Sequence, residues 1–124
     1  MIAADTSSII AYFGGSSGAD VERVAEALAA ESLILPPPVV SELYAGFHND
    51  PAFERIFASV PVISLVEGFW RRAGENRGLL LSKRLKTRFP DALIAQSCID
   101  AGIPLITRDT DYRHFAKWCG LILA

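Results

Sequence analysis

Short runs of apolar residues alternate along the chain with longer segments in which apolar residues recur at helical spacing. The short runs are rich in branched side chains and show little polar alternation, which is typical of strands covered on both faces. They predict strands at Met1–Ala4, Leu33–Leu35, Val62–Val66, Ile103–Ile106 and Leu121–Leu123. Proline has no amide hydrogen to continue a strand ladder, so the triplet Pro36-Pro37-Pro38 ends the second run.

The segments between these runs have the periodicity of amphipathic helices. In Asp20–Ala30, Val21, Val24, Ala25 and Leu28 fall on one face. Pro38 suits the first turn of a helix that continues to Phe47. Further helices are predicted at Pro51–Ser59, Glu67–Leu85 and Asp91–Ala101, the last with Asp91 as its N-cap and Gly102 as its stop. Strands that alternate with helices predict an α/β fold with a parallel sheet.

The length and composition predict one globular domain, residues 1–124. The chain is 51% hydrophobic and 21% charged, which is far from the profile of a disordered protein. A net charge of −2 argues against binding through a strongly basic arm. Cys98 and Cys119 form no CxxC pair, and we expect a reduced, cytoplasmic protein. The N-terminus lacks the basic region of a signal peptide, and no apolar run approaches the roughly 20 residues of a membrane span.

Five acidic residues stand where the ends of parallel strands would bring them together. Asp5 ends the first run, and Asp109 and Asp111 closely follow Ile103–Ile106. Glu42 lies about one turn inside the helix after the second run, and Asp91 opens the helix that leads to Ile103–Ile106. Ligands of such folds gather at the carboxyl ends of the strands, so all five acids could meet above one edge of the sheet.

Each acid also has a simpler interpretation when it is taken alone. Asp91 could be an N-cap, Glu42 a solvated helix residue, and Asp5, Asp109 and Asp111 could be turn residues. Their joint placement favours a site. Two like charges at ~4 Å cost several kcal/mol at an effective dielectric near 20, so such a group requires bound protons or cations. Oxygen-only clusters suit Mg²⁺ or Mn²⁺ and indicate metal-assisted phosphodiester hydrolysis.

Four acidic segments also occur in a characteristic order: Ile2–Ser7, Pro37–Leu43, Asp91–Ala95 and Thr107–Tyr112. In order and spacing they resemble the motifs of PIN-domain ribonucleases, most closely the VapC-like toxins of bacterial and archaeal toxin–antitoxin pairs. The segment Asp91-Ala92-Leu93-Ile94-Ala95 is similar to the most distinctive motif, Asp-x-x-Ile-Ala. Tyr112 departs from the pattern, because phenylalanine is commoner at this position.

The resemblance implies a three-layer αβα sandwich around a short parallel sheet, and Mg²⁺- or Mn²⁺-dependent endoribonuclease activity. It implies homodimerisation and neutralisation by a small antitoxin protein. Thr6, Ser7 and Thr107 would orient carboxylates or waters, and Tyr112 would be a packing residue. The catalytic, metal-binding acids carried over from the family are Asp5, Glu42, Asp91 and Asp109, with Asp111 as an additional or alternative fourth.

Basic and aromatic residues precede Asp91. Seven of the twelve basic residues lie within one stretch, namely Arg71, Arg72, Arg77, Lys83, Arg84, Lys86 and Arg88. Such a strip would attract RNA phosphates, although a solvated helix face is an equal alternative. Phe69, Trp70 and Phe89 could stack on RNA bases, but packing in the core or a dimer is the simpler interpretation. Trp118 and Cys119 are expected in the core.

Three other functions fit the sequence less well than a nuclease. A catalytically inactive PIN-like domain that binds RNA or a partner protein is disfavoured, because every acidic position is filled. A signalling receiver domain needs a phosphoacceptor aspartate near mid-chain, and Val60–Val66 contains none. A phosphatase with an Asp-x-Asp pair carries it after the first strand, whereas Asp109-Thr110-Asp111 lies near the end of the chain.

Overall fold

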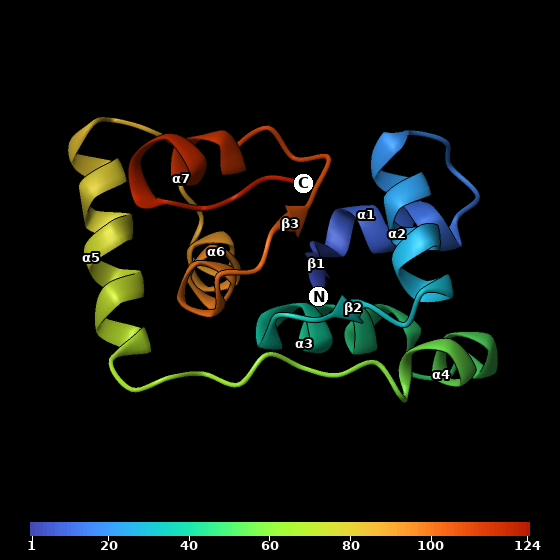
Figure 1. Cartoon of the computed structure of the whole chain (residues 1–124). Coiled ribbons are helices and arrows are strands. Elements are labelled where there is room, and N and C mark those ends of the chain that lie inside the picture. Colours follow the sequence, from blue (N-terminus) through green and yellow to red (C-terminus); the bar gives the residue numbers. More distant parts are fainter.

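Three short parallel strands form the centre of the molecule. The computed structural model describes the whole chain, residues 1–124 (Figure 1). The strands are β1 (Ile2–Ala4), β2 (Leu33–Ile34) and β3 (Leu105–Ile106), in the spatial order β2-β1-β3. Ile2 lies opposite Leu33, and Ala3 lies opposite both Ile34 and Leu105. The first strand is therefore central, and the parallel α/β sheet predicted from the sequence is confirmed.

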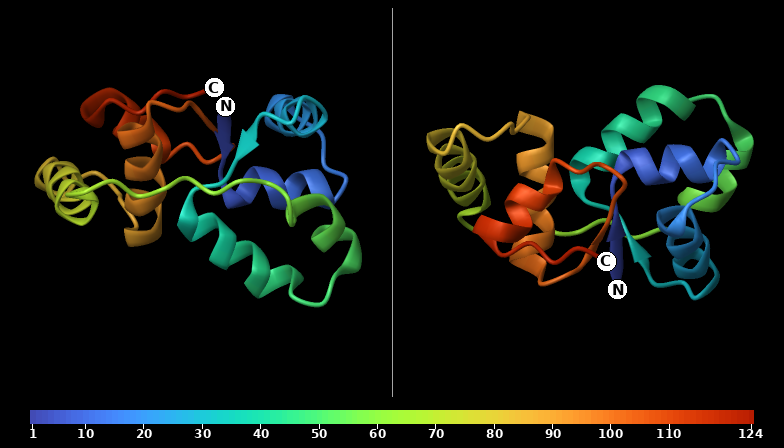
Figure 2. Two further views of the ribbon diagram at one scale, coloured as in Figure 1. Left: turned by 60° about the horizontal axis from the view of Figure 1, so that its bottom comes forward. Right: turned by 90° about the horizontal axis from the view of Figure 1, so that it is seen from above.

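Seven helices surround this sheet. They are α1 (Thr6–Phe13), α2 (Ala19–Ala29), α3 (Pro37–Phe47), α4 (Pro51–Phe57), α5 (Phe69–Ser82), α6 (Phe89–Ala101) and α7 (Tyr112–Cys119). Figures 1 and 2 show α5, α6 and α7 on one side of the sheet and α1 and α2 on the other, which makes three layers. Helix α3 crosses between the two sides and packs against both α1 and α6. No helix has the length and apolar character needed to cross a membrane.

Two of the five predicted strands are wrong. The segments Val62–Val66 and Leu121–Leu123 each form a single parallel bridge, between Leu35 and Val62 and between Leu105 and Leu123. The partner strands are bounded by Pro36 and Pro104, which have no amide hydrogen with which to extend the ladder. The sheet is consequently shorter than the apolar runs suggested.

The structure also corrects the helix predictions. Helices α1 and α7 were not predicted, and each contains only eight residues. Helix α6 begins at Phe89 with Pro90 in its first turn, so Asp91 is not the N-cap but a residue of that turn.

Trp118 is 42% exposed, and the prediction that it belongs to the core was wrong. Its ring instead lies 3.8 Å from the Lys83 ammonium.

The loop from β3 to α7 is tied to the opposite layer by an ion pair. Arg108 donates two hydrogen bonds to the Asp20 carboxylate, at 2.8 and 3.1 Å. Ser8 Oγ donates a third, at 2.8 Å. The Arg108 hydrogen bonds are the main reason that the pKa of Asp20 falls to about 2. The contact thereby holds the loop that carries Asp109.

We expect Asp20→Asn to lower the free energy of unfolding by about 1 kcal/mol at pH 7, because the Arg108 side chain is partly exposed. The pKa of Asp20 is lower in the folded state than in the unfolded state. The stabilisation is therefore complete above about pH 4 and is lost as the pH falls towards 2. Urea unfolding at pH 7 and pH 3 measures the loss. Glu22→Gln, which removes another acid from the first turn of α2, is the matched control. A destabilisation by Asp20→Asn that is as large at pH 3 as at pH 7 would contradict this assignment.

Candidate functional site

Asp5 lies at the carboxyl end of the central strand and is almost completely buried, with 5% of its surface exposed. Its amide donates to the Ile106 carbonyl at 2.9 Å, which fixes it beside the end of β3. Ser7 Oγ and Thr107 Oγ1 both donate to Asp5 Oδ2, at 2.8 and 3.0 Å. The first and the last strand thus hold this carboxylate together.

Asp91, Asp109 and Asp111 form the densest group of acids. Each offers a carboxylate oxygen within 4.8 Å of the others, and all three residues are partly exposed. The Asp109 amide donates to Thr107 Oγ1 at 3.0 Å, and the Asp111 amide donates to Asp109 Oδ1 at 2.9 Å. These bonds fold the loop before α7 so that its acids face the first turn of α6.

Tyr112 connects this group to Asp5. Its hydroxyl lies 3.4 Å from Asp5 Oδ1 and 3.3 Å from Asp91 Oδ1. Tyr112 was predicted to be a packing residue, and these contacts give it a polar role that was not predicted. The usable signal was the departure from phenylalanine at a position next to Asp111.

Glu42 is brought near the site but not into the dense group. It is exposed on α3, and its Oε1 accepts a hydrogen bond from Thr6 Oγ1 at 2.8 Å. The group of three acids described above does not include it. Of the five predicted acids, the structure therefore gathers Asp91, Asp109 and Asp111, links Asp5 to them, and leaves Glu42 at the rim.

Burial and the charges of neighbouring acids raise the pKa values of two of these residues, Asp91 and Asp5. Desolvation, followed by the charges of Asp5 and Asp109, raises the pKa of Asp91 to about 6. Burial also raises the pKa of Asp5, although Ser7 and Thr107 oppose the shift. The ionised cluster is thus unfavourable without a counter-charge.

The donor set fits a hard divalent cation. In the group formed by Asp91, Asp109 and Asp111, the side-chain atoms that could coordinate an ion are carboxylate oxygens, which Mg²⁺ and Mn²⁺ prefer. Asp91 Oδ2 is buried and has no hydrogen-bond partner, so one lone-pair site in the cluster remains unsatisfied. Asp91, Asp109 and Asp111 therefore have carboxylates close enough together to hold such an ion, and Tyr112 links Asp5 to this group.

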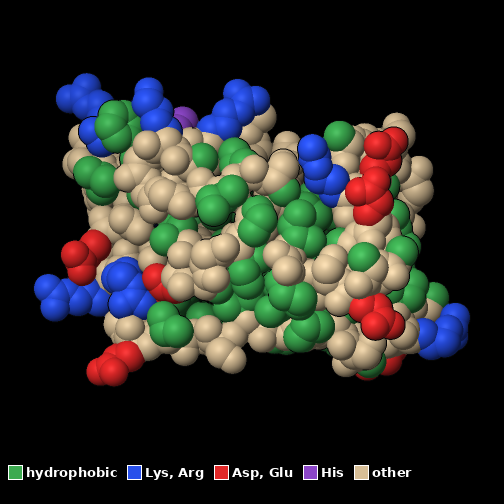
Figure 3. Space-filling model, in the orientation of Figure 1, with side chains coloured by type: hydrophobic (Ala, Val, Ile, Leu, Met, Phe, Trp, Pro, Cys, Tyr) green, Lys and Arg blue, Asp and Glu red, His purple; other side chains and the backbone are tan.

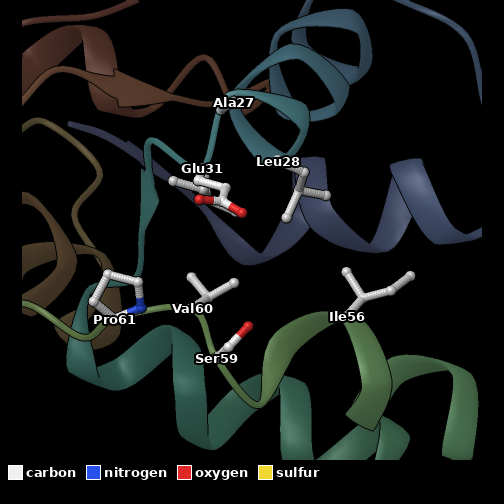
Figure 4. Close-up of a pocket in the computed structure, with 8 residues that line it drawn as sticks. Ala27, Leu28, Glu31, Ile56, Ser59, Val60 and Pro61 are labelled. Atoms are coloured by element: carbon white, nitrogen blue, oxygen red, sulfur yellow. The ribbon is translucent and has the colours of Figure 1, made fainter.

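An apolar groove of about 460 Å³ lies beside the first turn of α6, which carries Asp91. Glu42 lines it, and Pro90 places its wall next to Asp91. The exposed rings of Trp70 and Phe89 form part of this wall. A second cavity, of about 400 Å³, lies between α2 and α4 (Figure 4) and shares no residue with the acidic cluster.

Basic side chains are distributed unevenly. Figure 3 shows most of the visible Lys and Arg side chains over the side of the molecule formed by α5 and α7. Lys86 reaches the cluster itself, with its Nζ 3.7 Å from Asp111 Oδ2. The acidic site is therefore flanked by positive charge on this side.

The sequence model of the PIN domain matches residues 2–117. The chain belongs to the PIN domain family. This membership confirms the resemblance identified from the acidic motifs. None of the curated proteins compared with this PIN domain matches its sequence.

Solved structures share the fold over 98–100% of the chain. VapBC2 from Rickettsia felis, bound to a DNA fragment from its promoter, contains a chain that is 22% identical, with a TM-score of 0.72 and coverage of 100% of this chain and 98% of that one. FitAcB from Neisseria gonorrhoeae matches with 18% identity, a TM-score of 0.74 and coverage of 100% and 97%. A toxin–antitoxin complex from Klebsiella pneumoniae matches with 19% identity, a TM-score of 0.67 and coverage of 98% and 96%. The three-layer fold expected from the resemblance is confirmed.

We expect Asp91→Asn to stabilise the metal-free protein by about 1–2 kcal/mol at pH 7. The pKa of Asp91 is higher in the folded state than in the unfolded state, so wild-type stability falls as the pH rises from about 4 to about 6. The variant lacks this decrease. Urea unfolding in EDTA between pH 4 and pH 7.5 measures this decrease in wild type and its absence in the variant. Glu42→Gln, at the exposed rim, is the control and should change stability little. A variant less stable than wild type at pH 7 would show that repulsion does not dominate at Asp91.

Proposed function

We propose that this PIN domain is a Mg²⁺- or Mn²⁺-dependent endoribonuclease that acts as the toxin of a toxin–antitoxin pair. The observation that carries the proposal is the carboxylate cluster, in which Asp91 Oδ2 has no protein partner. Membership of the PIN domain family and the shared fold of toxin–antitoxin complexes support it. The all-oxygen donor set supports the choice of metal.

Asp5, Asp91 and Asp109 are proposed as the principal ligands. Asp109 lies close enough to Asp5 and Asp91 for its negative charge to raise the pKa of both. Asp111 is partly neutralised by Lys86, which favours an outer position in the site. A bound divalent ion would activate a water and offset the charge of the cleaved phosphodiester.

Hydroxyl groups of the protein hold two of the acids in place, and basic residues would guide the substrate to them. Ser7 and Thr107 hold the Asp5 carboxylate, and Thr6 holds Glu42 at the solvent-facing rim. RNA phosphates would approach from the basic side over α5, since the acids themselves repel them. Attack by water with breakage of the bond between phosphorus and the 3′-oxygen, as the resemblance to PIN-domain ribonucleases implies, would leave a 5′-phosphate and a 3′-hydroxyl.

The proposed partners are RNA, a cognate antitoxin protein and a second copy of the chain, in the cytoplasm. The exposed Trp70, Phe89 and Leu65 line one groove and provide an apolar surface that supports a homodimer. The alternative function, an inactive domain that binds RNA or a partner protein, is disfavoured because the acids at all the motif positions are retained.

Asp5→Asn and Asp91→Asn are expected to reduce cleavage of RNA by at least 100-fold while the protein remains folded, because each removes a charged ligand from the cluster. Purified protein is incubated with total bacterial RNA and Mn²⁺, and new 5′-ends are mapped. Glu22→Gln, an exposed acid on α2, is the matched control and should cleave like wild type.

Induction of the same variants in a bacterial host tests the toxin role. Wild type and Glu22→Gln should arrest growth with a few discrete cut sites, and Asp5→Asn should not. Full-rate cleavage by Asp5→Asn would exclude the proposed site. RNA binding without cleavage by the Mn²⁺-loaded wild type would favour the inactive alternative.

The homodimer is tested by sedimentation at micromolar concentration. Trp70 is the most exposed large apolar side chain, at 65%, so Trp70→Ser should raise the dimer dissociation constant at least tenfold. Ile10→Ser, another exposed apolar residue on α1, is the control. A monomeric wild type would contradict the proposed dimer.

A further inference from the structure

An aromatic ring without a hydroxyl group would be enough to fill the space that the Tyr112 side chain occupies. The side chain is completely buried, and its ring centroid lies 6.1 Å from that of Phe115. Phenylalanine would fill the same volume apart from one oxygen atom. That oxygen lies between two acids, 3.4 Å from Asp5 Oδ1 and 3.3 Å from Asp91 Oδ1.

The two acids depend on this hydroxyl to different degrees. Asp5 also accepts hydrogen bonds from Ser7 and Thr107, both on its Oδ2. The Asp91 carboxylate has Tyr112 as its one hydrogen-bond donor, and its Oδ2 has no partner. Without the hydroxyl, Asp5 would remain held, and Asp91 would have no group to fix its rotamer.

The hydroxyl also connects elements that the sheet does not join. Asp5 follows β1, Asp91 lies in the first turn of α6, and Tyr112 begins α7. Tyr112 is 107 residues from Asp5 and 21 residues from Asp91 in sequence. A single proton donated to either acid therefore sets the spacing of two carboxylates that come from different layers.

We propose that Tyr112 is a positioning residue that fixes Asp91 for cation binding. This inference rests on the proposed function, since it concerns the same divalent-cation site. The hydroxyl engages Asp91 Oδ1 and leaves the unpartnered Oδ2 for the ion. A preformed Asp91 rotamer removes an ordering cost that would otherwise accompany binding.

The test compares Mn²⁺ binding to purified wild type and Tyr112→Phe by calorimetry, without RNA. The dissociation constant for Mn²⁺ should rise about tenfold in the variant, as expected when a group that orients a metal ligand is removed. Tyr44→Phe is the matched control, because the Tyr44 hydroxyl on α3 faces Glu54 of α4 rather than the clustered acids, so its loss should not affect binding. Cleavage by Tyr112→Phe should be reduced at limiting Mn²⁺ and should recover at saturating Mn²⁺.

A second measurement is independent of metal. Thermal unfolding in EDTA is compared for wild type, Tyr112→Phe, Asp91→Asn and the double variant. If the hydroxyl acts through Asp91, the Tm changes of the single variants should not add.

The outcomes separate this inference from the proposed function. Equal or tighter Mn²⁺ binding by Tyr112→Phe, or additive Tm changes, would overturn the positioning role and leave the nuclease proposal intact. A Tyr112→Phe protein that does not fold would assign the hydroxyl to the fold and would also overturn that role. A wild type that does not bind Mn²⁺ would overturn the proposed function itself, and the inference with it.

Discussion

The burial of an aspartate at the end of the central strand is the constraint on which the rest of the site depends. Asp5 is 5% exposed, and burial raises its pKa despite two hydroxyl donors. Ionised carboxylates are unfavourable in such surroundings unless donors and counter-charges are provided. The surrounding groups are arranged accordingly: Ser7 and Thr107 donate to Asp5 Oδ2, and the Tyr112 hydroxyl lies 3.4 Å from Asp5 Oδ1.

The short sheet explains how acids distant in sequence meet. The strands contain two or three residues each, and α6 packs closely beside them with most of its middle turns buried. The small side chains Ala3, Ala4, Ala92 and Ala95 are buried in the same core, which allows α6 to approach the sheet. The first turn of α6 therefore reaches the end of β1, and Asp91 lies beside Asp5 and Asp109.

The sequence predicted the layout of the site better than its internal contacts. Asp5 and Asp109 could be predicted because apolar runs end just before them, and the ends of parallel strands share one edge. Asp91 was predicted as a site residue, but its cap role was wrong, because Pro90 fits a first turn that begins earlier. Helices α1 and α7 were missed since eight residues give too few apolar repeats to establish a period. The Tyr112 hydroxyl could not be predicted from periodicity, which registers only its ring as apolar.

The strand order β2-β1-β3 has a consequence for how the protein acquires its chemistry during synthesis. Asp5 leaves the ribosome before Thr107, Asp109 and Tyr112, because Thr107 lies 102 residues further along the chain. A nascent chain that lacks β3 has an incomplete sheet edge and only part of its carboxylate cluster. The carboxylate centre is thus completed only after β3 and the loop that follows it have been synthesised, and a product truncated before β3 carries the early acids without the centre that they help to form.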